Sequence, residues 1–284
     1  MSTSDLIYAG DLPSRPQLRP GALWQSLKSL KRPLAALVPY IFPVGVLLLW
    51  EAAAAAGLLP DILMPRPSAV AVSAWETLIS GELFTHLGVS ALRALSGLAI
   101  GGSIGFLLGL ANGVSPLFRE ATDTTLQMIR NIPNLALLPL VIIWFGIGEG
   151  AKLFLVSIGV FFPIYLNTLH GIRNVDPQLI EMGSAYGMKR TELFRKILLP
   201  GALPSVFVGL RYALGIMWLT LIVAETLSAS SGLGYMAMKA REFMILETVV
   251  LSIILYALLG KLADVITRAL ERRALAWSPA YAAS

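Results

Sequence analysis

The chain has 284 residues, of which 56% are hydrophobic and 14% are charged, whereas soluble domains carry roughly 25% charged residues. A soluble globule of this size cannot bury so much apolar surface, and the low polarity also excludes a disordered chain. Lys and Arg number 22 against 17 Asp and Glu, a net charge of +5. In so apolar a chain, this excess indicates basic flanks at a cytoplasmic membrane face rather than nucleic-acid binding. We therefore predict an all-α integral membrane protein.

Six segments are long and apolar enough to cross a bilayer, which takes about 20 residues of α-helix. In chain order they are residues 34–56, 91–112, 132–148, 151–170, 203–225 and 245–266. We expect them to form one transmembrane domain over residues 34–270, between an N-terminal segment, 1–33, and a C-terminal tail, 271–284.

The distribution of Lys and Arg orients these spans. Basic residues gather in residues 1–33, 113–131, 171–202 and the tail, which alternate along the chain with poorly basic connections. By the positive-inside rule, the basic segments face the cytoplasm. Both termini are then cytoplasmic, which agrees with an even number of spans.

The two other long connections, residues 57–90 and 226–244, are expected on the outer side. The first has an apolar pattern at helical spacing that predicts an amphipathic helix over about residues 69–80. Glu225 falls at the outer end of the fifth span, where we expect its carboxylate to reach water.

The chain lacks the residue patterns of a metalloenzyme or a nucleotide hydrolase. It has no cysteine, and its two histidines, His86 and His170, lie far apart in the sequence and lack an HExxH spacing. It also has no Gly-x-x-x-x-Gly-Lys-Ser/Thr loop for nucleotide phosphates. We therefore expect no catalytic residue, no metal site and no ATP hydrolysis by this chain.

The second span carries a glycine every four residues, at Gly97, Gly101, Gly105, Gly109 and Gly113. On a helix these positions form one stripe without side chains, along which another backbone can approach closely. The stripe predicts tight helix–helix packing, and a moving interface during transport is a compatible second interpretation.

The cytoplasmic segment 171–202 is too polar for the membrane and is patterned like two short helices. Gly187 can end the first helix, and the second is expected to stop at Pro200. Two such helices indicate a docking surface for a soluble partner, and packing against the protein's own helix ends is the alternative. The apolar positions are Leu179, Ile180, Met182, Ala185 and Tyr186 in the first helix and Leu193, Phe194, Ile197 and Leu198 in the second.

This segment contains Glu181-Met-Gly-x-x-x-Gly187, then nine residues, then Ile197-x-Leu199-Pro200. The pattern resembles the EAA loop of bacterial ATP-binding-cassette (ABC) importer permeases, and only Met182 and Gly183 depart from it, in place of two alanines. The resemblance implies a coupling helix that contacts an ATPase subunit. The coupling residues that it implies are Glu181, Met182, Ala185, Gly187, Leu199 and Pro200.

The resemblance extends over most of the chain, from about residue 35 to 281. Residues 127–140 are similar to permeases for aliphatic sulfonates, taurine, nitrate and bicarbonate. Residues 162–168, 215–225 and 234–243 are most similar to those for aliphatic sulfonates. The family implies a type I ABC importer permease fold of six transmembrane helices, in a bacterial inner membrane.

The same resemblance implies an assembly of several chains. Two permease copies line the path, two ATP-binding subunits hold ATP and Mg on the cytoplasmic side, and a substrate-binding protein delivers the cargo outside. This chain is then expected to bind no cofactor and to form the path through the bilayer, while energy enters through residues 171–202.

A path for an anion needs hydrogen-bond donors or weak positive potential, because an ion that is held too firmly does not leave. Residues of suitable chemistry in or beside the spans are Asn131, Asn134, Arg211, Trp218 and Thr220. Two structural alternatives stay open, namely Trp218 as a packed aromatic and Arg211 as a charge that extends to the cytoplasmic interface. Lys261 and Asp264, three residues apart on the sixth span, are expected to pair.

Other functions have different requirements. Import of taurine, nitrate or another small solute by the same machinery is the nearest alternative, because specificity in such importers is implied to reside largely in the external binding protein. A stand-alone channel needs no cytoplasmic docking segment, and an intramembrane enzyme needs convergent polar catalytic groups, which this sequence does not supply.

Overall fold

The computed structural model describes residues 41–60, 63–228 and 230–278, and every regular element among them is helical. The N-terminal segment 1–33 and the beginning of the first predicted span lie outside the described residues. In chain order the elements are a helix at Ile41–Ala55, α2 at Pro67–Ile79, α3 at Glu82–Val114, α4 at Pro116–Arg130, a 3-10 turn η1 at Asn134–Leu137, α5 at Leu138–Phe145, α6 at Glu149–Arg173, α7 at Pro177–Ala185, α8 at Arg190–Leu193, a π-helical turn η2 at Phe194–Leu198, α9 at Leu199–Ser228, α10 at Leu233–Glu242 and α11 at Leu246–Ala274.

By length and composition, four of the described helices can cross a membrane. They are α3, α6, α11 and the continuous helix Arg190–Leu227, which joins α8, η2 and α9. A fifth span results if α4 and the η1–α5 pair, which are bent by 84° relative to each other, are counted together, and helix Ile41–Ala55 is apolar but shorter. The described residues therefore form an all-α membrane protein with four or five candidate spans, where the sequence predicts six.

Residues 132–148 do not form the single span expected from hydropathy. The helical stretch begins earlier, at Pro116, inside the segment 113–131 that was expected to be a cytoplasmic loop, and it breaks before η1 and α5. Proline explains the break, because Pro133 has no backbone N–H to donate and its ring crowds the carbonyl four residues earlier. Hydropathy therefore indicates only the apolar half of this bent element, the part after Pro133, and not the polar half before it.

Pro200 does not end the second cytoplasmic helix, contrary to the expectation from sequence. The helix continues from Arg190 to Leu227, with residues 194–198 in a wider π-helical turn. A proline cannot donate to the carbonyl four residues before it and needs room for its ring. A turn with i→i+5 hydrogen bonds directly upstream supplies that room.

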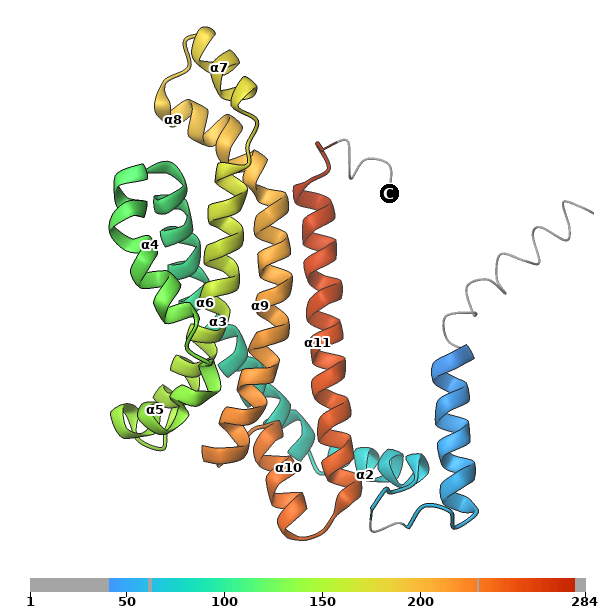
Figure 1. The fold of residues 1–284 in the computed structure, drawn as a ribbon. Coiled ribbons are helices and arrows are strands. Elements are labelled where there is room, and N and C mark those ends of the chain that lie inside the picture. Colours follow the sequence, from blue (N-terminus) through green and yellow to red (C-terminus); the bar gives the residue numbers. More distant parts are fainter. Residues whose placement is uncertain (1–40, 61–62, 229, 279–284) are drawn as a thin grey trace, which may run out of the picture.

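α6 lies at the centre of the bundle, between α3 and α9 (Figure 1). Apolar side chains from all three helices meet in one buried core there. This core fixes the mutual positions of the three helices on which most of the candidate functional residues lie. Its buried residues are Ala94 of α3, Val156, Val160 and Ile164 of α6, and Ala213, Leu214, Met217 and Leu221 of α9.

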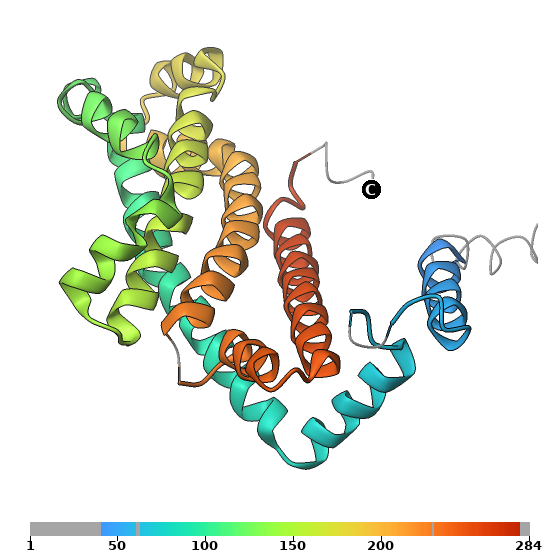
Figure 2. The same ribbon diagram turned by 60° about the horizontal axis from the view of Figure 1, so that its bottom comes forward.

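The two ends of the bundle carry different elements. α7 and α8 project from one end, whereas α2, α10 and the first turn of α11 lie at the other (Figures 1 and 2). Because α7 belongs to the basic segment 171–202, the positive-inside rule predicts that its end faces the cytoplasm. α2 confirms the helix expected over about residues 69–80.

The glycine stripe of α3 lies directly against the backbone of α6. A Cβ atom on Gly101 would lie 2.0 Å from the Ser157 carbonyl oxygen, and one on Gly105 would lie 2.6 Å from that of Phe161. No side chain fits between the two helices, so their backbones touch and van der Waals packing holds them. At the other three positions, a Cβ atom would overlap a side chain of α6. It would lie 2.4 Å from Val156 for Gly97, 2.7 Å from Thr168 for Gly109 and 2.8 Å from Ile172 for Gly113.

We expect Gly101→Ala to destabilise the protein, because the new methyl group overlaps a backbone carbonyl that cannot rotate away. Overpacking of this kind typically costs about 1–3 kcal/mol. Gly88→Ala is the matched control on the same helix, since nothing lies within 4 Å of its Cβ position. Thermal unfolding of the detergent-purified protein should give a lower Tm for the Gly101 variant alone. Equal Tm values would contradict the close contact.

Candidate functional site

α7 is a short helix on the projection at one end of the bundle, with a defined start and end. The Asp176 carboxylate accepts a hydrogen bond from the Gln178 N–H (2.9 Å), and Pro177 occupies the first turn. At the other end Gly187 has φ +78°, a left-handed conformation that favours glycine. Its N–H donates to the Ser184 carbonyl (3.0 Å). The helix therefore ends where the sequence predicts.

α7 packs on the following helix through Gly183 and leaves its opposite face open. A Cβ atom on Gly183 would lie 2.6 Å from the end of the Leu193 side chain, so glycine lets the two helices approach closely here. On the open face, Leu179, Met182 and Tyr186 are 45%, 50% and 81% exposed. Their i, i+3, i+7 spacing places them in one row. We call these three residues the α7 stripe.

The other predicted coupling residues differ in position. Glu181 and Ala185 are exposed on α7 itself. Leu199 and Pro200 are half-buried in the first turn of α9, where they join the projection to the bundle. The α7 stripe is therefore the apolar part of this region that another protein can reach.

A buried ion-pair network lies at the opposite end of the bundle. Glu225 is 1% exposed, so the expectation that it reaches water is wrong. Its carboxylate accepts hydrogen bonds from Arg93 Nη1 (2.7 Å), Ser90 Oγ (2.8 Å), the Gly234 N–H (2.9 Å) and Tyr256 Oη (2.8 Å). A carboxylate removed from water needs such donors, because its desolvation is otherwise too costly.

Arg93 joins the two carboxylates of this network. Its side chain is 5% exposed and donates to both oxygens of Glu149 (2.5 and 2.6 Å), to Glu225 and to the Ser231 carbonyl (2.5 Å). Lys152, whose side chain is 3% exposed, pairs with Glu149 at 3.1 Å. Two cations thus meet two carboxylates, and Glu149, 56% exposed, is the member that reaches the surface.

The network connects α3, α6, α9, α10 and α11, and it is not among the features predicted from the sequence. A usable signal was present, because Arg93 lies inside the second predicted span and Glu225 closes the fifth. Ionisable groups at membrane depth pair with one another. A cation and a carboxylate on two different spans were therefore an indication of mutual contact.

Two of the predicted path residues, Asn134 and Thr220, come together in the bundle. Asn134 Nδ2 donates to Thr220 Oγ1 (3.3 Å) and to the Leu155 carbonyl (3.4 Å), while its Oδ1 is buried without a hydrogen-bond partner in the described structure. Gly159 makes room for both side chains, since its Cβ would lie 2.8 Å from Asn134 Nδ2 and 3.0 Å from Thr220 Oγ1. Asn131 lies exposed, directly after α4.

The other two predicted path residues lie in structural contacts. Trp218 packs edge-on against the ring of Tyr256, with ring centroids 6.2 Å apart. Arg211 bonds to Glu271 and lies 3.7 Å from Asp264, so it ties α9 to α11. The same Asp264 is 3.9 Å from its expected partner on α11, the lysine three residues earlier.

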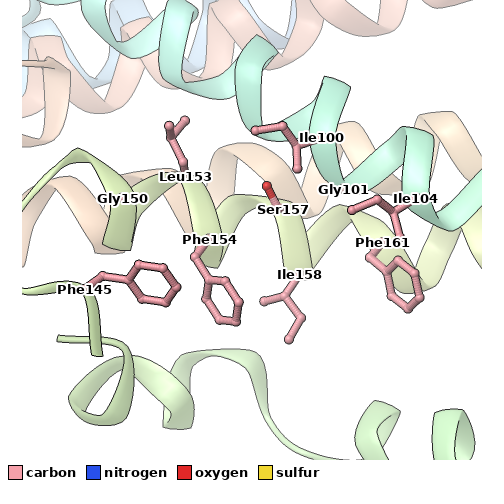
Figure 3. Close-up of a pocket in the computed structure, with 10 residues that line it drawn as sticks. All are labelled: Ile100, Gly101, Ile104, Phe145, Gly150, Leu153, Phe154, Ser157, Ile158 and Phe161. Atoms are coloured by element: carbon pink, nitrogen blue, oxygen red, sulfur yellow. The ribbon is translucent and has the colours of Figure 1, made fainter. Parts of the chain in front are cut away.

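A cavity of about 330 Å³ lies between α3, α5 and α6 (Figure 3). Figure 3 shows the rings of Phe145, Phe154 and Phe161 along it, with Ser157 as the lining residue that carries a side-chain oxygen. That hydroxyl already donates to the Gly97 carbonyl (3.3 Å). The cavity therefore offers apolar contacts and no free polar group to a solute.

A second cavity, of about 360 Å³, lies beside the interruption between α4 and α5. Its walls come from residues 129–137, from the middle of α6 and from Ile216 of α9. Arg130 and Asn134 line it with polar side chains, and its other lining residues are apolar or glycine. We call it the break cavity.

Known proteins resemble this chain over most of its length. Residues 101–275, more than half of the chain, match the family described as binding-protein-dependent transport system inner membrane component. A protein of Escherichia coli (strain K12) that carries the name aliphatic sulfonates transport permease protein is 54% identical over 252 residues, 89% of this chain and 96% of the relative. A protein of the same name from Bacillus subtilis (strain 168) is 40% identical over 241 residues, 85% of this chain and 87% of the relative.

Solved structures share the fold. A chain from the crystal structure of an amino acid ABC transporter with histidines superposes with a TM-score of 0.56 at 18% identity, over 71% of this chain and 96% of that chain. At this level of identity the likeness concerns the arrangement of the helices and not the cargo.

Removal of the Arg93 guanidinium should destabilise the protein more than removal of an exposed charge. Arg93→Ala leaves Glu225 buried without its cation, which costs about 3–5 kcal/mol. Lys261→Ala, the control, removes a cation that is 67% exposed and 3.9 Å from its partner, worth about 1 kcal/mol or less. Unfolding of the detergent-solubilised variants measures both losses. Similar losses would show that the network is no stronger than a surface pair.

Proposed function

The chain belongs to the family of binding-protein-dependent transport system inner membrane components, and from this premise we propose that its cargo is an aliphatic sulfonate. It is the permease component of an ABC importer, and the ATPase of such a transporter is a separate subunit. The observation that carries the proposed cargo is the 54% identity, over 89% of the chain, to the E. coli relative named for aliphatic sulfonates.

The α7 stripe is the proposed contact with the ATPase subunit. α7 projects beyond the end of the bundle (Figure 1), and the three apolar side chains of the stripe are exposed there. An exposed apolar row at helical spacing suits a groove in a partner protein. Glu181 and Ala185, exposed on the same helix, flank this contact, while Gly187, Leu199 and Pro200 set the position of α7 on the bundle.

The proposed assembly contains two permease copies, two ATPase subunits that hold ATP and Mg, and an extracytoplasmic binding protein. The family description itself supports dependence on a binding protein. Six spans, with both termini in the cytoplasm, result if helix Ile41–Ala55 belongs to a first span over 34–56 and the bent pair counts as the third. This topology keeps the basic segments on one side of the membrane.

α4 supports a path for a polar solute beside it. It is the most polar part of the candidate spans, and none of its residues is buried within the described structure. Polar side chains at membrane depth are tolerated where they line a water-filled cavity or meet another protein surface. We propose that the path runs between α4 and a second copy of this chain, past Asn131, Asn134 and Thr220. The polar and charged residues of α4 are Arg119, Glu120, Thr122, Asp123, Thr124, Thr125, Gln127 and Arg130.

Met182→Glu should weaken the association with the ATPase subunit, because it places a charge in the α7 stripe that a partner's apolar groove must desolvate. Thr191→Glu is the matched control, since it adds the same carboxylate to an exposed, polar position on the same projection. Co-purification of the ATPase subunit with the tagged permease measures the association. Unchanged co-purification with Met182→Glu, at equal amounts of permease, would contradict the assigned contact.

Deletion of the gene for this chain should abolish growth on alkanesulfonates as sole sulfur source and leave growth on sulfate and taurine intact. The reason is that the chain forms the path for that cargo alone. The measurement is growth in a strain without another alkanesulfonate importer, with the intact gene returned on a plasmid as control. Undiminished growth on ethanesulfonate, or an equal defect on taurine, would overturn the proposed cargo.

A further inference from the structure

The break cavity lies at half the height of the bundle. Its α6 wall runs from Ile158 to Leu166, and α6 extends from Glu149 to Arg173. At a rise of 1.5 Å per residue, this wall lies more than about 10 Å from either end of the helix. A group that enters the cavity is therefore near the middle of the membrane-spanning part of the protein.

The guanidinium of Arg130 places a positive charge at this depth. It is the last residue of α4, it lines the cavity, and it forms no ion pair with another residue of the described structure. Such an isolated charge is costly inside a membrane and marks a pathway or a ligand site. By contrast, Arg93 of α3 has two carboxylates for partners. The natural partner for Arg130 is an anion that is not part of this chain.

Asn134 adds hydrogen-bonding capacity beside Arg130. Its Oδ1 is a buried atom with no partner in the described structure, and its Nδ2 contacts, at 3.3 and 3.4 Å, are at the long limit for a hydrogen bond. Buried polar groups are normally paired with protein, water or ligand. An amide with one orphaned atom and two long bonds can exchange them for shorter bonds to a ligand.

The remaining walls are apolar, with Leu137, Phe162, Leu166 and Ile216 among them. The cavity thus combines one cation and one amide with an apolar compartment, which matches a small amphiphilic anion. Its volume of about 360 Å³ falls at the lower end of the roughly 300–1,000 Å³ that small-molecule sites occupy.

We propose that the break cavity is a transit site for alkanesulfonates, with the sulfonate group on the Arg130 guanidinium and the Asn134 amide and the alkyl tail against Phe162, Leu166 and Ile216. This inference rests on the proposed function and adds the residues that hold the cargo within the membrane. A guanidinium binds an oxyanion through parallel N–H donors. A single cation at an open site also releases its ion, as transport requires.

The head-group contact is tested in proteoliposomes that contain the complete importer, with the binding protein supplied outside and ATP at the ATPase subunits. Arg130→Gln should lower the uptake of both ethanesulfonate and hexanesulfonate by about tenfold or more, because it removes a charge-assisted hydrogen bond. Arg130→Lys should keep part of the uptake at a higher KM, since a point charge replaces the fork of donors. Lys261→Gln removes an exposed cation of α11 that does not line the cavity, and should keep uptake within about twofold.

The tail contact is tested by chain length. Ile216→Phe fills the apolar compartment, so the ratio of hexanesulfonate to ethanesulfonate uptake should fall by about tenfold. This ratio is measured within one preparation, and it does not depend on how much importer has folded or assembled. Unaltered protein and Lys261→Gln give the reference ratio.

The outcomes separate the two proposals. If the unaltered importer carries neither alkanesulfonate, the proposed cargo is wrong. If it carries both, and Arg130→Gln also carries both at the reference rate, the transit site is overturned while the cargo stands. If Arg130→Gln fails to assemble, the Ile216→Phe ratio decides, and a ratio equal to the reference overturns the site.

Discussion

The contact between α3 and α6 determines the rest of this structure. In lipid, two helices gain little by hiding apolar side chains from each other, so close backbone packing has to hold them. Gly101 and Gly105 permit this, because their missing side chains let α3 rest on the carbonyl groups of α6. The same register brings Arg93, one turn before Gly97, to Glu149 at the start of α6. One helix contact therefore sets both the packing and the ion pairs, and α9 completes the unit through Glu225.

Arg93 and Arg130 differ in role because they lie in different surroundings. Arg93 is enclosed by carboxylates and holds neighbouring helices together. The cost of removing its charge from water is offset by several hydrogen bonds. Arg130 ends a polar helix at a break in the chain and faces a cavity that supplies no carboxylate. The fold keeps the first charge out of reach of a solute and leaves the second one accessible. Arg93 thus stabilises the bundle, whereas Arg130 is the contact proposed for the cargo.

Features that depend on local spacing could be predicted from the sequence. The α7 helix and its end at Gly187, the helix at Pro67–Ile79 and the Lys261–Asp264 pair all follow from residues a few positions apart. The bent third element could not be predicted, because a hydropathy average assigns the polar residues 116–130 to a loop although tertiary contacts bring them beside α3. The burial of Glu225 could not be predicted either, because its donors come from three other elements, α3, α10 and α11.

The continuous helix Arg190–Leu227 has a mechanical consequence. It is 38 residues long, which corresponds to about 57 Å at 1.5 Å per residue. One end lies beneath α7, through the contact with Gly183, and the other carries Glu225. If this helix pivots as one body about one end, a tilt of about 5° moves the other end by about 5 Å. A displacement at the α7 end of this helix can therefore reach the ion pairs at the opposite end of the bundle through one continuous element, without a chain of bonds that must break and re-form in between.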